Sequence, residues 1–180
     1  YKLFETGDYK SLSAQISITE EGNVFDLLKV ENPIINNIDL IGISLIHSDK
    51  ISEIFASLKG EHFSGKQVLS EVIELIRLYR EEEYSLAEIQ SIEYNPEENR
   101  LKIYVDEGMI SRIDVTGNDK TNESVITREF NFEEGDFFRV RDVEKGLTNL
   151  RSTKLFDNID VAVKEDSGQN ILVINVNEKP

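Results

Sequence analysis

The residues of this chain that come nearest to a known chemical motif lie between Gly60 and Gln67. The segment GEHFSGKQ approaches the phosphate-binding pattern G-x-x-x-x-G-K-[ST], in which backbone N–H groups cradle phosphates and the last hydroxyl binds Mg²⁺. Gln67 stands at the hydroxyl position, and a helix rather than a buried strand is predicted before Gly60. A simpler interpretation explains every residue: Gly60 ends one helix, and Ser64 with Gln67 forms the capping box of the next.

The histidines and the acidic run Arg80-Glu81-Glu82-Glu83 do not form a metal-binding pattern. His47 and His62 are the only histidines, and neither stands in H-E-x-x-H or H-x-x-E-H spacing. The acidic run lacks the alternating acidic residues and glycine of a calcium loop, so we interpret it as a solvated helix end. The sequence also contains no cysteine and no G-x-S-x-G elbow. We therefore expect no catalytic residue, no metal site and no cofactor.

The composition is that of a folded, acidic chain. Hydrophobic residues make up 39% of the sequence, and 35 Asp and Glu against 20 Lys and Arg give a formal net charge of −15. Such a charge repels phosphate backbones, and no basic stripe with interleaved aromatic residues occurs, so we expect no nucleic-acid partner. No apolar run approaches the roughly 18 residues of a membrane-spanning helix.

An internal repeat organises the chain. The segments beginning at Leu3 and Leu150 align without a gap, at an offset of 147 residues, and the identical pairs are Leu3 and Leu150, Thr6 and Thr153, Glu31 and Glu178, and Pro33 and Pro180. A second alignment has an offset of 75 residues, and its pairs include Ile38 and Ile113, Gly42 and Gly117, Phe55 and Phe130, Gly60 and Gly135, and Val68 and Val143. Matching aromatic residues and glycines in two alignments indicate repeated modules of about 75 residues.

The repeat divides the chain into a partial module, residues 1–33, and two complete modules, residues 34–108 and 109–180. Residues 1–33 align with the end of a module, so we expect a hairpin without helices of its own and a chain taken from a longer row. We also expect this hairpin to pack against another module or to exchange between chains. Very short joints connect the modules, at Pro33 and Ile34 and at Gly108 and Met109.

Each complete module is predicted to have the order β-α-α-β-β. Around Ile38 apolar and polar residues alternate, which is typical of a strand with one buried face. Helical spacing follows at Ile51, Ile54, Phe55 and Leu58, with Ser48 as the expected cap, and again at Val68, Val72, Leu75, Ile76 and Tyr79. Residues 87–94 and 101–105 read as a hairpin. The last module repeats this order over residues 113–116, 122–130, 140–150, 158–163 and 171–176. The fold class is therefore α+β, with two helices covering a three-stranded mixed sheet.

This strand order predicts an exposed sheet edge in each module. The first strand is expected to pair in parallel with the last, which leaves the second strand with one neighbour. Its unpaired backbone groups can accept an extended peptide as a further strand, or can simply be protected by flanking charges. The candidate binding residues are Ala87, Glu88, Ile89, Gln90, Ser91, Ile92, Glu93 and Tyr94, and in the last module Asn158, Ile159, Asp160, Val161, Ala162 and Val163.

Three stretches of the sequence resemble a known family. They are LIRLYREEEYSLAEI followed by LKIYVDEGMISRIDVTGN, then VITREFNFEEGDFFRVRDVEKGLTNLRSTKLFDNIDVAV, and LFETGDY with VENPIINNIDLIG. In this order and spacing they are similar to the POTRA (polypeptide-transport-associated) domains of BamA-type outer-membrane barrel-assembly proteins. One departure is Glu83-Tyr84, where many members have Gly-Tyr.

The resemblance implies a periplasmic array, the soluble part of an outer-membrane protein whose C-terminal β-barrel lies in the membrane. It implies that unfolded outer-membrane protein clients and periplasmic accessory proteins or lipoproteins bind by strand augmentation, without a cofactor. POTRA modules also occur as connectors of barrel-tethered patatin-like lipases, and in two-partner secretion and TamA-type transporters. These remain alternative parents, and the sequence on either side of this segment would distinguish them.

Overall fold

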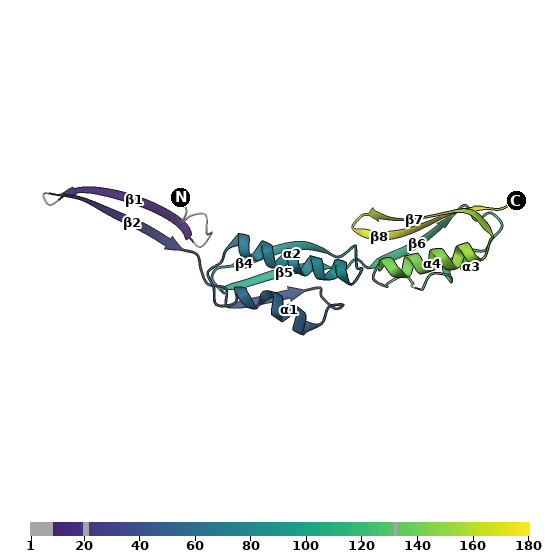
Figure 1. Cartoon of the computed structure of the whole chain (residues 1–180), viewed down its shortest axis with the longest axis horizontal. Helices are drawn as coiled ribbons and strands as arrows, with labels where there is room; N and C mark the ends of the chain where they lie inside the picture. The colour runs from purple at the N-terminus through teal and green to yellow at the C-terminus, as the bar shows by residue number, and fades with distance from the viewer. Residues whose placement is uncertain (1–8, 20–21, 132) are drawn as a thin grey trace. The chain divides into compact units, whose positions relative to one another are not determined.

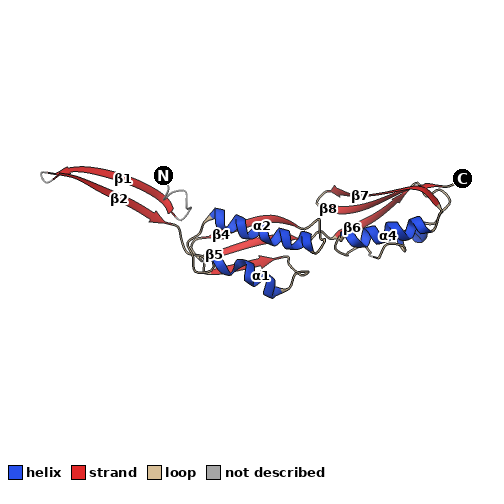
Figure 2. Ribbon diagram, in the orientation of Figure 1, coloured by secondary structure: helices blue, strands red, loops and turns tan. Residues whose placement is uncertain are grey.

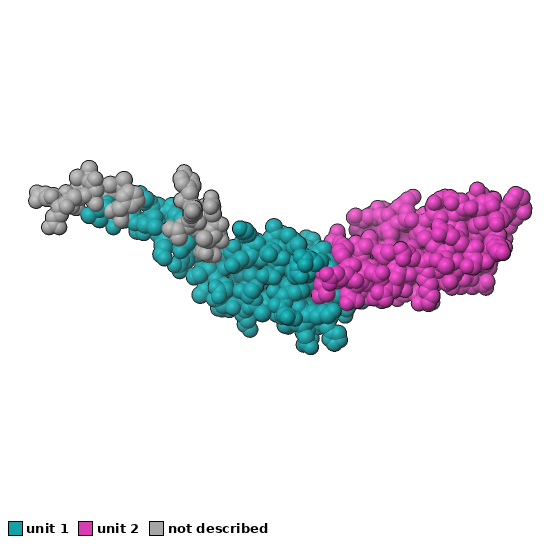
Figure 3. Space-filling model, viewed as in Figure 1, with its two compact units in different colours: residues 1–77, 89–105 teal, residues 78–88, 106–180 magenta. Residues whose placement is uncertain are grey.

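The computed structural model describes residues 9–19, 22–131 and 133–180. The chain divides into two compact units, one of Tyr1–Arg77 with Ile89–Val105 and one of Leu78–Glu88 with Asp106–Pro180 (Figure 3). The order of helices and strands can be followed in Figure 1. Residues 78–88, which lie inside the predicted module 34–108, therefore belong to the same compact unit as the predicted module 109–180.

The chain begins with an antiparallel hairpin. Strands β1 (Tyr9–Thr19) and β2 (Gly22–Glu31) pair in a register that places Ser13 opposite Leu28. The exposed fraction of the side chains of Val24, Leu27, Leu28 and Val30 lies between 43% and 59%. Strand β2 therefore presents apolar residues to solvent, and the packing or exchange of this hairpin stays a prediction.

A three-stranded mixed sheet follows in the first complete repeat. Its strands are β3 (Asn37–Ile41), β4 (Glu88–Asn95) and β5 (Arg100–Asp106), in the order β3-β5-β4, with β3 parallel to β5. Its helices are α1 (Ser48–Phe55), the short 3-10 helix η2 (Ala56–Leu58) and α2 (Gly65–Glu81) (Figure 2). On β5 every second side chain (Leu101, Ile103, Val105) is buried, which is the pattern of a strand covered on one face.

The second complete repeat has the same topology. Strands β6 (Ile110–Thr116), β7 (Phe156–Asp166) and β8 (Gln169–Glu178) form a sheet in the order β6-β8-β7, and its helices are α3 (Glu123–Thr127) and α4 (Val140–Ser152). Strand β8 pairs in parallel with β6 and antiparallel with β7. The core of this sheet consists of Ile110, Ile126, Phe130, Val143, Leu150, Phe156, Ile159, Leu172, Ile174 and Val176. The predicted fold class, α+β with mixed three-stranded sheets, is confirmed.

The helix ends show where local sequence rules hold and where they fail. Ser48 was expected to cap α1, but the cap position is His47, which makes no side-chain capping hydrogen bond, and Ser48 is the first helical residue. Asn122 does cap α3, because its side-chain oxygen accepts a hydrogen bond from the N–H of Ser124. Helix α3 ends at Thr127, short of the predicted Phe130, because the chain tightens there into a turn in which the N–H of Phe130 donates to the carbonyl of Thr127.

The glycines that end the first strands are required by the sheet itself. Gly42 and Gly117 have φ of +89° and +81°, and a Cβ atom on them would lie 2.1 Å from the carbonyl oxygen of Val105 and 2.0 Å from that of Val176. Any side chain would collide with the central strand, so the same residue type recurs in both repeats.

Helix α4 also carries a glycine that packing requires. A Cβ on Gly146 would lie 2.2 Å from the ring of Phe130, whereas a Cβ on Gly65, in α2, meets nothing within 4 Å. We expect Gly146→Ala to destabilise the protein by about 1–3 kcal/mol, because the aromatic ring must move, against the usual gain of roughly 1 kcal/mol for alanine in a helix. Gly65→Ala is the matched control and should be neutral or stabilising in urea unfolding. Equal effects of the two substitutions would contradict this account.

Candidate functional site

Strand β4 lies at one edge of its sheet, with β5 as its neighbour in the sheet order. Of the candidate residues there, Ala87 is fully buried and precedes the strand, and Ile89 and Tyr94 are half-buried. The remaining side chains on the strand are exposed, and Ile92 is a large apolar residue with 40% of its surface open to solvent. The edge is therefore accessible along most of its length.

Helix α2 runs beside β4 in the opposite direction. At its start Phe63 stacks on Tyr94, with ring centroids 4.4 Å apart, and at its end the guanidinium of Arg80 donates to the carbonyl of Ala87 at 2.7 Å. Glu71 points the other way, toward η2, where its carboxylate accepts from the hydroxyl of Ser57.

An apolar stripe of α2 follows from these contacts. At 100° per residue, Leu69, Ile73 and Ile76 share the side of Arg80 and lie away from Glu71. Leu69 and Ile73 are 54% and 56% exposed. They form what we call the α2 stripe, an apolar wall next to the β4 edge.

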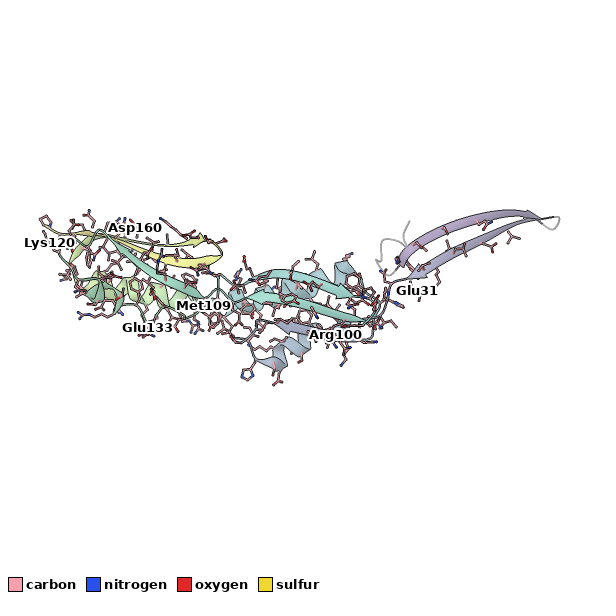
Figure 4. The ribbon with its side chains drawn as sticks, turned by 180° about the vertical axis from the view of Figure 1, so that it is seen from behind. Glu31, Arg100, Met109, Lys120, Glu133 and Asp160 are labelled. Atoms are coloured by element: carbon pink, nitrogen blue, oxygen red, sulfur yellow. The ribbon has the colours of Figure 1, made fainter. Side chains whose placement is uncertain are left out.

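In the described part of the chain, the β7 edge has no such apolar stripe on its neighbouring helix α4. Strand β7 is also an edge strand, and Asp160 lies on it (Figure 4). Its Asn158, Asp160 and Ala162 side chains are exposed, whereas Ile159 is buried and Val161 and Val163 are half-buried. The repeat alignment pairs Leu69 with Glu144 and Ile73 with Thr148, both polar and exposed. The two candidate edges thus share a backbone geometry, but among the described residues the exposed apolar wall beside β4 has no counterpart beside β7.

The segment that approached the phosphate-binding pattern uses its backbone elsewhere. The N–H groups of Gly60 and Phe63 donate to the carbonyls of Ile35 and Pro33, both at 2.8 Å. These donors are committed to the Pro33–Ile34 joint and cannot cradle a phosphate. Within the described residues no group of three or more His, Cys, Asp or Glu side chains is placed to hold a metal ion, and no helix is long and apolar enough to cross a membrane.

The joint at Gly108 and Met109 is closely packed within the second unit. Gly108 has φ of +76°, and a Cβ on it would lie 2.4 Å from the Cβ of Leu86. Its carbonyl accepts from the N–H of Phe138 at 2.9 Å, and Met109 forms an isolated β-bridge with Phe137. A side chain larger than hydrogen is excluded at this joint.

The turn after α2 is held by the start of α4. Glu83 has φ of +68°, a left-handed conformation that glycine adopts without strain. This explains why glycine is common at this position in the Gly-Tyr pattern, from which the present sequence departs. The carbonyl of Glu83 accepts from the N–H of Val140 at 3.1 Å, and its carboxylate forms an ion pair with Arg141. The guanidinium of Arg139 lies 5.2 Å from the ring centroid of Tyr84. These contacts explain why residues 78–88 belong to the second unit.

A buried polar pair lies at the same joint. The hydroxyl of Tyr79 donates to the carboxylate of Glu107 at 2.7 Å, and both side chains are almost fully buried. Burial raises the pKa of the Tyr79 phenol well above its ordinary value, and the hydrogen bond to Glu107 and the charge of Glu107 raise it further.

Sequence reasoning missed two parts of this surface. The first strands β3 and β6 are also edge strands, since each pairs only with the central strand of its sheet. The α2 stripe was also missed. The helical spacing was used to find the buried positions of the helix, and Leu69 and Ile73 lie one turn apart outside that spacing, on the exposed side. The signal was present, as Leu69 and Ile73 have polar equivalents in the aligned repeat.

Comparison with known proteins identifies the class. The family model for POTRA, described as a surface antigen variable number repeat, matches residues 33–108 and 109–179. This covers most of the chain with two consecutive copies of the same domain. The chain belongs to the POTRA family.

Solved structures share this fold. The N-terminal domain of Omp85 from the thermophilic cyanobacterium Thermosynechococcus elongatus superposes with a TM-score of 0.86 and 20% identity, over 99% of this chain and 80% of that one. POTRA domains 1–3 of the periplasmic domain of Omp85 from Anabaena give a TM-score of 0.78 and 22% identity, over 99% of this chain and 78% of that one. CdiB from Escherichia coli gives a TM-score of 0.66 and 15% identity, over 82% of this chain and 27% of that one.

The buried pair makes stability depend on pH. The folded protein holds the Tyr79 proton more tightly than the unfolded chain, so the stability from this group is complete below the ordinary pKa of about 10 and falls as pH rises above it. We expect Tyr79→Phe to cost about 1–3 kcal/mol at pH 7, because Glu107 loses this donor, and to reduce the loss of stability between pH 9 and pH 11. Urea unfolding at the three pH values measures both effects. An unchanged slope above pH 9 would show that Tyr79 does not contribute.

Proposed function

We propose that this pair of POTRA modules binds unfolded outer-membrane protein clients by strand augmentation at the β4 edge. The observation that carries the proposal is the α2 stripe, in which Leu69 and Ile73 stand exposed beside an edge strand. An extended client segment placed next to β4 would bond to the strand through its backbone. Alternate side chains of that segment would lie over the apolar wall.

This chemistry suits a receptor for many clients. Main-chain hydrogen bonds do not depend on the client's sequence, and an outer-membrane strand has apolar residues at every second position. The β7 edge offers the same backbone, with Glu144 and Thr148 in place of the stripe. We therefore assign β4 the main role and β7 a weaker one.

The wider setting of the proposal is a periplasmic array attached to a C-terminal β-barrel in the outer membrane. Family membership supports it. Accessory proteins or lipoproteins would bind the same array, whose modules act as a scaffold and not as an enzyme. Reading the parent gene on both sides of this segment tests the setting directly: a long run of alternating strands downstream supports it, and a G-x-S-x-G hydrolase domain upstream points to a lipase connector instead.

Titration with a synthetic outer-membrane strand peptide tests the binding edge. We expect the backbone amides of residues 88–95 to shift first in NMR spectra of the 180-residue chain, and those of residues 156–166 to follow at higher concentration. Ile92→Lys should weaken binding about fivefold, because the loss of its apolar contact with the peptide costs roughly 1 kcal/mol of binding free energy.

Ile41→Lys is the matched control, because Ile41 has nearly the same exposed fraction, 41% against 40% for Ile92, but lies on β3. Its substitution should leave the affinity at β4 unchanged. Shifts confined to the helices would rule out strand augmentation at β4.

A further inference from the structure

A groove lies at the opposite edge of the first sheet, between strand β3 and helix α1. It has a volume of about 430 Å³, and its apolar lining includes Ile38, Leu40, Ile51 and Phe55. Lys59 lines the same groove and is exposed. We call it the β3–α1 groove. It is distinct from the β4 edge, which lies on the other side of β5.

Two residues of β3 present unpaired backbone groups to this groove. The N–H of Asn37 points toward the β5 side, where it donates to the carbonyl of Asn99 at 3.1 Å. Because backbone groups alternate in direction along a strand, the N–H and C=O of Ile38 and Leu40 point away from β5. Within the described part of the chain, neither residue has a hydrogen-bond partner on that side.

In the second repeat, a side chain of the same chain bonds to the equivalent edge-strand N–H. Its equivalent groove, about 580 Å³, is lined by Ile113, Phe130 and Glu134, among others. There the carboxylate of Glu134 accepts a hydrogen bond from the N–H of Ile113 at 3.2 Å, so the edge of β6 is capped by its own chain. The repeat alignment pairs Ile113 with Ile38 and Glu134 with Lys59. An acceptor in one groove is thus replaced by a cation in the other.

We propose that the β3–α1 groove is a second docking site, and that it takes an extended polypeptide segment carrying a glutamate side chain next to apolar residues. The ligand's carboxylate accepts from the N–H of Ile38, as the carboxylate of Glu134 does from Ile113, and forms an ion pair with Lys59. Its neighbouring apolar side chain enters the groove over Ile51 and Phe55. This inference goes beyond the proposed function, because it concerns the other edge and a partner with a charge requirement.

The geometry explains why a carboxylate is needed. The backbone upstream of Ile38 is already paired, since the N–H of Ile35 donates to the carbonyl of Glu61 and the carbonyl of Ile35 accepts from Gly60. Only Ile38 and Leu40 remain for a ligand, which is too short an edge to hold a strand by main-chain bonds alone. A charge-assisted hydrogen bond and an ion pair supply the remaining attraction.

The test uses the 180-residue chain and a capped nine-residue peptide of alternating valine and threonine with one central glutamate. We expect saturable NMR shifts at the amides of Ile38 and Leu40, and an affinity about tenfold lower for the same peptide with a central lysine. Lys59→Glu should abolish these shifts by capping Ile38 from within. Glu134→Lys should create them at Ile113. Both positions are exposed, so an otherwise unchanged spectrum verifies folding of each variant.

The outcomes separate this inference from the proposed function. Shifts at Ile38 that depend on the glutamate and on Lys59 support the second site, whether or not β4 responds. Shifts confined to β4 and β7 overturn it and leave the proposed function standing. Shifts at Ile38 that survive Lys59→Glu, or that the lysine peptide reproduces at equal affinity, also overturn it. Absence of any shift contradicts both proposals.

Discussion

Each three-stranded sheet of this protein has a single interior strand, and the rest of the two complete modules depends on that constraint. Strands β5 and β8 are hydrogen-bonded on both sides, so every other strand of the two sheets is an edge. Two helices cover one face of such a sheet but cannot close its sides. Every module of this kind therefore has unpaired backbone groups on its two edge strands. The modules differ in the side chains that the neighbouring helix and loop place beside each edge.

The two repeats keep the same strand order and the same glycine beside the interior strand. Glycines at 42 and 117 allow the chain to cross the carbonyl groups of Val105 and Val176, where no side chain fits. Around this common frame the edges have diverged. Leu69 in one repeat corresponds to Glu144 in the other, and Lys59 corresponds to Glu134. The frame resists change because it is sterically closed, whereas the edges accept it because their side chains reach solvent.

Much of the fold could be predicted from the sequence, because its periodicities reflect burial. The helical spacing of Val68, Val72 and Leu75 was confirmed by buried side chains. The alternation predicted around Ile38 was wrong in detail, since Ile38, Asp39 and Leu40 are all half-buried. The strand order, with the last strand at the centre, followed from the β-α-α-β-β pattern. Helix ends were less predictable. His47 rather than Ser48 holds the cap position of α1, a choice that depends on backbone angles and not on residue type.

The candidate site could be predicted only in part. Sequence located β4 and β7 as edges because strand order alone decides that. The contrast between them depends on which side of α2 faces β4. This is fixed by the hydrogen bonds of Glu71 with Ser57 and of Arg80 with Ala87, whose partners lie 14 and 7 residues away in the sequence. Likewise, the alignment shows Lys59 opposite Glu134, but only the structure shows a carboxylate on a strand N–H. Contacts between residues joined by a loop produce no periodic pattern in the sequence, so they could not be predicted from it.

The Lys59–Glu134 exchange also has a genetic consequence. In the standard code the lysine and glutamate codons differ by a single purine transition at the first base. A module of this kind is therefore one mutation away from sealing the β3–α1 groove or opening its counterpart. Duplicated modules can then change their partners without passing through an unstable intermediate, since the position is exposed in both repeats and the core does not depend on it.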